Sequence, residues 1–100
     1  MPNAEFAKLL SQAADLLELD DDNPFRIRAF RRAAQTIEYF PKELSALSRT
    51  DRLAIPGIGK GIADMLEEFE AKGSVSELNR LKKKYPSGVL EMMSLVDDEV

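Results

Sequence analysis

The segment 53–64 is the part of the chain best suited to bind a ligand through its backbone, because three glycines fall within five positions there. Pro56 fixes φ just before this turn, while a glycine can take a positive φ or let another backbone come close. The apolar spacing that follows predicts an amphipathic helix from about Lys60, and backbone N–H groups at its N-terminus could bind a phosphate oxygen. A plain turn joining two helices is the alternative. The candidate phosphate-binding residues of the turn are Gly57, Ile58, Gly59, Lys60 and Gly61.

Four arginines between residues 26 and 32 form a second candidate contact with phosphate. On a helix, Arg28, Arg31 and Arg32 fall opposite the apolar residues, whereas Arg26 lies near the apolar edge. A solvated basic face is the common meaning of such a pattern. The density of charge favours contact with phosphate, so Arg26, Arg28 and Arg31 join the candidate site, with Arg26 as its leading member.

The composition excludes several kinds of chemistry. The chain has no cysteine and no histidine, which excludes disulfides, thiolate chemistry, zinc sites and histidine acid–base catalysis. The acidic run Asp20-Asp21-Asp22 lacks the spacing of a calcium loop, and we interpret it as a solvated linker that caps the next helix. The run Lys82-Lys83-Lys84 either complements the dipole of a helix end or adds a second phosphate contact, and the first interpretation is favoured.

Helical periodicity and capping signals predict the elements that position these residues. The first helix runs from about Asn3 to Leu19, and Asn23-Pro24 starts a second that ends near Tyr39. A short third helix is expected over residues 41–47. A single turn capped by Thr50-Asp51 then leads into the glycine segment.

The second half of the chain is expected to be helical as well. The helix after the glycine segment should end at Gly73, a residue suited to a left-handed C-terminal position. Ser74 to Glu77 has the spacing of a capping box and predicts a helix that reaches about Lys84. A last short helix is expected over residues 89–95, with its two methionines filling the core.

Strand-like alternation is absent from the sequence, so the expected fold is all-α, a compact bundle of short helices. One hundred residues predict one domain, over 1–96, followed by a frayed acidic tail at 97–100. The N-terminal residues do not resemble a signal peptide and no apolar run is long enough to cross a membrane. The expected location is therefore the cytoplasm.

The charge is unevenly distributed along the chain. The formal net charge of −4 argues on its face against a nucleic acid partner. However, residues 1–23 carry one lysine against six acidic residues, and residues 61–100 carry five basic against nine acidic residues. Residues 24–60 carry eight basic residues against three acidic ones. This basic middle third contains the arginines and much of the glycine turn, and a local field of that sign suits a phosphate chain.

Three stretches together resemble one known family. Residues 55–63 resemble a helix-hairpin-helix motif, in which a Gly-hydrophobic-Gly turn holds DNA backbone without reading sequence. With residues 23–34 before it and residues 85–90 after it, the chain resembles the N-terminal domain of family X DNA polymerases, particularly the bacterial and archaeal members. The resemblance covers nearly all of residues 3–95.

The resemblance implies a compact helical domain that binds gapped or nicked DNA in repair and grips the 5′-phosphate downstream of the gap. It also implies a monovalent cation, K⁺ or Na⁺, held by the backbone carbonyls of Leu53, Ile55 and Ile58. No cofactor is required for binding. Polymerase or repair proteins are further possible partners, and a membrane is not.

The sequence departs from the polymerase beta pattern of this family at the positions that matter for lyase chemistry. Where that pattern has the lysine that forms a Schiff base with an abasic sugar, this chain has Met65, which cannot form an imine. Three further lysines are replaced by Arg26, Gly61 and Leu53, and a tyrosine by Phe30. Arg26 keeps its charge and suits bidentate phosphate contact. The residues of a two-metal polymerase site are not recognisable in this chain.

The sequence therefore predicts a non-sequence-specific DNA-binding module rather than an enzyme. Two alternatives stay open. The first is a 5′-deoxyribose-phosphate lyase that uses another amine, Lys60 being the best candidate. The second is a protein-interaction module, which the acidic flanks suggest.

Overall fold

Helices connected by short loops make up residues 1–85, the part of the chain that the computed structural model describes. The elements in order are α1 (Asn3–Leu19), α2 (Pro24–Glu38), the 3₁₀ turn η1 (Leu44–Ala46), α3 (Arg49–Leu53), α4 (Lys60–Lys72) and α5 (Ser76–Lys84). No strand occurs within this described range, which confirms the expected all-α fold. None of these helices is long and apolar enough to cross a membrane.

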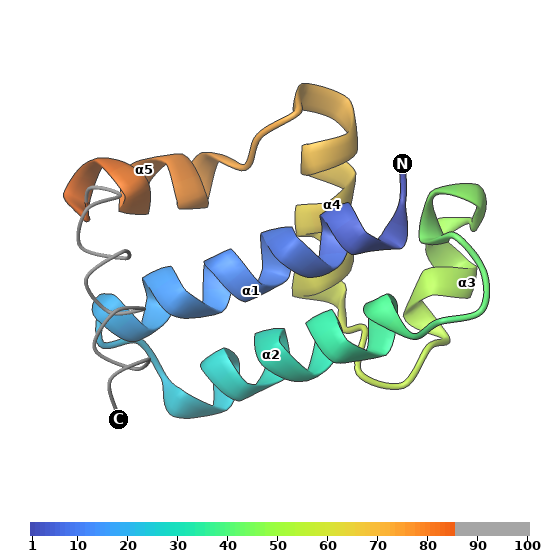
Figure 1. The fold of residues 1–100 in the computed structure, drawn as a ribbon, viewed down its shortest axis with the longest axis horizontal. Coiled ribbons are helices and arrows are strands. Elements are labelled where there is room, and N and C mark those ends of the chain that lie inside the picture. The colour runs from blue at the N-terminus through green and yellow to red at the C-terminus, as the bar shows by residue number, and fades with distance from the viewer. Residues whose placement is uncertain (86–100) are drawn as a thin grey trace.

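Helices α1 and α2 form an antiparallel pair, α5 packs on α1, and α3 packs on α4 (Figure 1). The buried residues of α1 run from Phe6 to Leu17 in adjacent pairs spaced three or four positions apart, so one broad face of the helix lies in the core. Helix α2 begins as the sequence predicts, with the Asn23 side chain accepting a hydrogen bond from Phe25 N at 2.8 Å and Pro24 in the first turn. It ends at Glu38, one residue before the predicted Tyr39.

The predicted helix over residues 41–47 is wrong, because only the 3₁₀ turn η1 forms in that stretch. The side chain of Asn3 explains the difference. Its amide donates to the Lys42 carbonyl at 2.7 Å, and its oxygen accepts from Leu44 N at 2.9 Å. These bonds engage backbone groups that a regular helix would use itself. The cap of α3 also differs from the prediction, since Ser48 rather than Thr50-Asp51 caps it by accepting from Asp51 N at 3.2 Å.

The start of α5 departs from the predicted capping box. Its N-cap residue is Val75, which cannot accept a hydrogen bond through its side chain. The carboxylate of Glu68 on α4 takes that role, since it accepts from Ser76 N at 2.9 Å and from Ser76 Oγ at 2.7 Å. These two bonds hold the pKa of Glu68 below its usual value. The predicted end of α4 is confirmed, with Gly73 in the left-handed region at φ 72°.

The acidic linker between α1 and α2 differs from the predicted solvated linker that caps α2, because Asn23 caps that helix and Asp20 is bonded to the end of α5. Asp20 accepts from Lys84 Nζ at 2.6 Å and from Tyr85 Oη at 2.9 Å, which ties the end of α5 to the linker and lowers the pKa of the Asp20 carboxyl. Asp22 accepts from Asn23 N at 2.7 Å, next to the α2 cap. Within residues 1–85, no group of three acidic side chains is arranged to hold a metal ion. The predicted helix over 89–95, its Met92 and Met93, and the acidic tail lie outside the described residues.

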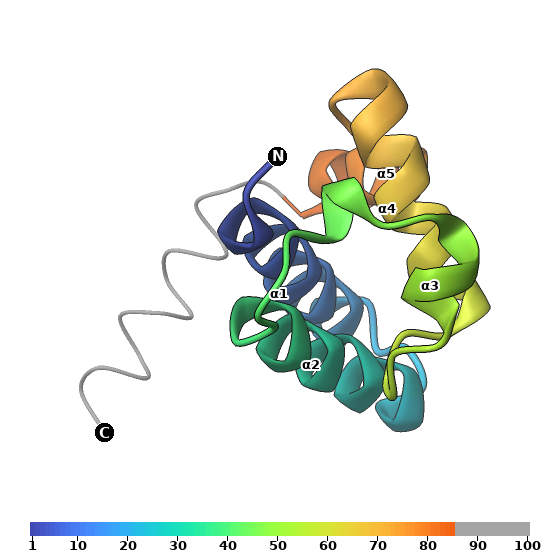
Figure 2. The ribbon, with the colours of Figure 1, turned by 90° about the vertical axis from the view of Figure 1, so that its right-hand side faces the viewer.

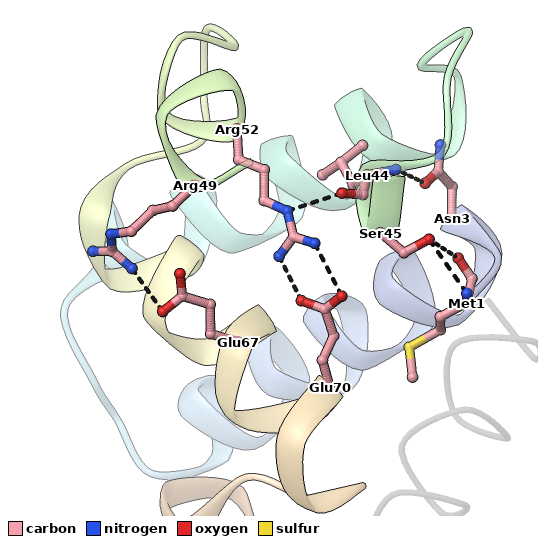
Figure 3. Close-up of polar contacts among 8 residues, drawn as sticks. All are labelled: Met1, Asn3, Leu44, Ser45, Arg49, Arg52, Glu67 and Glu70. Atoms are coloured by element: carbon pink, nitrogen blue, oxygen red, sulfur yellow. Dashed lines mark hydrogen bonds and ion pairs between the residues drawn. The ribbon is translucent and has the colours of Figure 1, made fainter. Parts of the chain in front are cut away.

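A buried arginine joins α3 to α4, and no pattern in the sequence predicts it (Figure 3). Arg52 is 4% exposed. Its guanidinium donates to Glu70 Oε1 and Oε2 at 2.5 and 2.9 Å and to the Leu44 carbonyl at 2.9 Å. Arg49, on the outer side of α3, pairs with Glu67 at 2.9 Å. These contacts fix α3 against α4 on the side away from the connecting turn.

Candidate nucleic-acid interface

The turn between α3 and α4, residues 54–59, is held by two buried isoleucines and is called the hairpin loop below. Ile55 and Ile58 are 8% and 3% exposed, and Ile58 N donates to the Ile55 carbonyl at 3.0 Å. Pro56 and Gly57 occupy the two central positions, and Gly57 has φ 94°. This is the pattern of a type II turn, which favours glycine at its third position. A Cβ on Gly57 would make only an ordinary contact, 3.6 Å from Thr36 Oγ1 of α2, so the positive φ of the turn by itself explains this glycine.

The other two glycines have no such explanation within the described chain. Gly59, the N-cap residue of α4, has φ −85°, which any residue can adopt. Gly61 lies in the first turn of α4, where glycine is a poor helix former. A Cβ at either position would meet nothing within 4 Å. The absence of both side chains leaves the surface in front of the helix start open.

The same helix start presents backbone donors without partners. No side chain caps α4, and its first intrahelical bond runs from Ala63 N to the Gly59 carbonyl. Between residues 1 and 85, the backbone N–H groups of Gly59, Lys60, Gly61 and Ile62 donate no hydrogen bond. Free N–H groups at a helix N-terminus carry partial positive charge and suit an anion.

A hollow of about 260 Å³ lies in front of these donors, between the hairpin loop and α2, and we call it the hairpin hollow. Figure 2 shows the hairpin loop beside α2. A second hollow of about 340 Å³ adjoins the first, sharing Ala29 and Gly57 with it. The hairpin hollow is lined by Arg26, Ala29, Phe30, Gly57, Gly59, Gly61 and Ile62. The adjoining one is lined by Phe25, Arg28, Ala29, Arg32 and Gly57.

The structure brings Arg26 and Arg28 to these hollows, together with Arg32, which is not among the residues predicted for the site. Arg28 lies 5.0 Å above the ring of Phe25, a side chain that is 74% exposed. Arg31 is not brought there, since its guanidinium pairs with Asp15 at 3.1 Å and Glu18 at 2.6 Å on α1. The sequence signal for Arg32 is its spacing, because it follows Arg28 by four positions and therefore lies on the same side of α2.

The structure also shows where the two residues relevant to lyase chemistry, Met65 and Lys60, lie. Met65 is 6% exposed and belongs to the hydrophobic core, as its position on the apolar stripe predicts. Lys60 is exposed at the first position of α4 and forms no ion pair within residues 1–85. It stays the candidate amine of the lyase alternative.

Comparison with known proteins agrees with this geometry. A family model described as a helix-hairpin-helix domain matches residues 1–75. The DNA polymerase/3′-5′ exonuclease PolX of Bacillus subtilis (strain 168) is 35% identical over 95 residues, which cover 95% of this chain and 16% of that protein. The matched part of the relative is its N-terminal region. The chain thus spans about a sixth of the length of the relative it matches.

These findings confirm the resemblance drawn from the sequence. The match extends over α1, α2, the hairpin loop and α4, so it includes every residue placed at the two hollows. The chain belongs to the helix-hairpin-helix domain family, and it is a DNA-binding domain of the type found at the N-terminus of family X DNA polymerases.

Proposed function

We propose that this domain holds DNA by a backbone phosphate at the start of α4, and that its preferred ligand is the 5′-phosphate of gapped or nicked DNA in repair. The observation that supports this most is the open helix start. Four N–H groups without partners in the described chain face a surface that Gly59 and Gly61 leave bare. Neither glycine is required by the fold, whereas a phosphate close to the backbone would require both.

The cations around the hollows suit the same ligand. Arg26 lines the hairpin hollow, Arg28 and Arg32 line the adjoining one, and Lys60 lies exposed at the helix start. In contact with phosphate, these four side chains would position the DNA without reading its sequence. With three to five phosphate contacts, raising the salt from 50 to 200 mM would lower the affinity by a factor on the order of tens to hundreds.

A terminal 5′-phosphate suits the hairpin hollow better than an internal phosphodiester. A terminal phosphate carries a second negative charge near neutral pH and exposes three oxygens, so it can accept from the helix start and from an arginine together. The hairpin hollow offers both kinds of donor, with Arg26 on one wall and the start of α4 on the other. This is the physical basis for a preference for gapped or nicked DNA.

A monovalent cation, K⁺ or Na⁺, is proposed at the carbonyls of Leu53, Ile55 and Ile58. Leu53 ends α3, where the helix carbonyls carry partial negative charge. Within residues 1–85 no hydrogen bond ends on the carbonyls of Leu53 or Ile58, and Ile55 accepts one from Ile58 N. These oxygens fit the preference of hard cations for carbonyl ligands. Tighter DNA binding in potassium than in tetramethylammonium chloride at equal ionic strength would support this site, and equal binding would exclude it.

The variant Gly59→Ser tests the phosphate site. Serine is a better N-cap residue than most and its hydroxyl can accept from the N–H groups of α4, so thermal stability should be kept or raised. The same hydroxyl would occupy the donors that a phosphate needs. Fluorescence anisotropy should show tighter binding of the wild type to a gapped duplex with a 5′-phosphate than to one with a 5′-hydroxyl. Gly59→Ser should lose that preference.

The matched control is Ala71→Ser, which adds the same hydroxyl at an exposed position near the far end of α4. It should bind both duplexes as the wild type does. If Gly59→Ser bound as tightly as this control, the helix start would not be the phosphate site. If the wild type bound both duplexes equally, the domain would recognise DNA backbone in general and not a 5′-phosphate.

A further inference from the structure

Arg26, the arginine of the hairpin hollow, is shared by two carboxylates from different parts of the chain. Its Nη2 lies 2.6 Å from Glu77 Oε1 on α5, and its Nη1 lies 3.3 Å from Asp22 Oδ2 in the linker before α2. All three side chains are partly exposed, by 39% for Arg26, 34% for Glu77 and 28% for Asp22. One positive charge therefore stands between two negative ones at the wall of the proposed phosphate site.

This arrangement sets Arg26 apart from the neighbouring cations. Within the described chain, Arg28 and Arg32 form no ion pair with a carboxylate. A phosphate approaching them meets an available cation, whereas a phosphate approaching Arg26 meets two carboxylates that already hold it. Like charges at such short range repel, and they repel more strongly where water is partly excluded.

The contact with Glu77 is not needed to place the Arg26 side chain. The guanidinium also lies 5.5 Å from the centre of the Phe30 ring, and Asp22 holds it from four residues earlier. Nor does α5 depend on the contact, because Leu78 and Leu81 are 1% and 0% exposed in the core. The Glu77 side chain can therefore turn into solvent while α2 and α5 stay packed.

We propose that Glu77 competes with the DNA phosphate for Arg26, holding the guanidinium in the free protein and releasing it when the phosphate enters the hairpin hollow. The competition rests on the proposed phosphate site. It makes Glu77 a residue that limits affinity without contacting DNA. An exposed ion pair contributes little stability, so a phosphate can displace it, and removing it should strengthen binding about two- to fivefold.

The test measures the binding of the full chain to the gapped duplex with a 5′-phosphate, by fluorescence anisotropy, for wild type and Glu77→Gln. The matched control is Glu38→Gln, which makes the same change in net charge at the opposite end of α2. We expect Glu77→Gln to bind two- to fivefold more tightly and Glu38→Gln to bind like the wild type. In an Arg26→Gln background, the additional Glu77→Gln substitution should have no effect.

Several outcomes would overturn the proposal. Equal or weaker binding by Glu77→Gln would show that the carboxylate positions Arg26 or is irrelevant to binding. An equal gain in Glu38→Gln, or a gain that persists without Arg26, would show an effect of net charge alone. The Gly59→Ser variant tests the phosphate site separately from the Glu77 competition. If Gly59→Ser loses the preference for the 5′-phosphate while Glu77→Gln shows no gain, the phosphate site stands and only the competition is wrong. If no variant bound DNA, both proposals would fall.

Discussion

The substitution Glu70→Gln should destabilise the domain far more than the same change at neighbouring Glu67. Glu70 binds the guanidinium of Arg52 through both carboxylate oxygens, and the Arg52 side chain is only 5% exposed (Figure 3). A glutamine of the same shape offers one acceptor and directs an NH₂ group at another donor. A buried positive charge would then lose its counter-charge and one hydrogen bond.

The expected magnitude follows from the burial of the two partners. Breaking a fully buried ion pair by removing one partner costs about 3 to 5 kcal/mol, whereas exposed pairs contribute about 0.2 to 1 kcal/mol. Arg52 is buried but Glu70 is 28% exposed, so water can reach part of the site. The Leu44 carbonyl also keeps its bond to Arg52 Nε. We therefore expect a loss of about 2 to 3 kcal/mol in the free energy of unfolding.

Thermal unfolding followed by circular dichroism measures this loss. For a domain of this size, 2 to 3 kcal/mol lowers the melting temperature by about 10 to 20 °C. In Glu67→Gln the affected partner, Arg49, is 35% exposed and keeps Asp64 at 2.7 Å. Its melting temperature should fall by a few degrees at most. Equal losses in the two variants would refute the argument that the burial of Arg52 makes the Glu70 pair critical.

Three further changes have defined outcomes. Gly57→Ala should lower the free energy of unfolding by about 1 to 2 kcal/mol in urea titrations because of its positive φ, while Gly61→Ala should not lower it. Arg32→Gln should weaken DNA binding and reduce its salt dependence in anisotropy titrations, while Arg31→Gln, whose arginine is held by α1, should do neither. Hydrogen bonds from Ser76 lower the pKa of Glu68 in the folded state below its ordinary value of 4.5. The ionised carboxylate therefore stabilises the fold above pH 4.5, and this stabilisation should be lost as the pH falls through the lower, folded-state pKa. Urea titrations at several pH values measure the loss.

The helices could be predicted where local signals decide them. The bounds of α1, the cap of α2, the start of α4 and its end at Gly73 follow from periodicity, Asn-Pro and glycine, which act within one or two turns. The prediction over residues 41–47 failed because the side chain of Asn3, the first residue of α1, forms hydrogen bonds with the backbone of Lys42 and Leu44. The capping box at α5 failed for the same reason, since Glu68 of α4 caps Ser76. Contacts between residues distant in sequence have no local signature.

The backbone of the candidate site could be predicted from the sequence, whereas the ion pairing of its arginines could not. The turn around Gly57 and the burial of Ile55 and Ile58 follow from residue type. Which arginines face the hairpin loop depends on where the acidic residues of other helices lie. Arg31 is neutralised by α1 and Arg26 is shared with α5, whereas Arg32 is left available. A linear count of charge treats these three arginines as equivalent.

The placement of acidic residues also explains how a chain with a net charge of −4 can present a basic surface. Most of the ion pairs lie away from the hairpin hollow, on α1, on the outer face of α4 and at the end of α5. Each of these pairs sets a negative charge beside an arginine or lysine and so lowers the local positive field there. Among the arginines that line the two hollows, Arg28 and Arg32 form no ion pair within residues 1–85, whereas Arg26 is paired with two carboxylates. Negative charge elsewhere on the domain would repel DNA bound at the start of α4 only weakly, since exposed charges more than about 10 Å apart are largely screened.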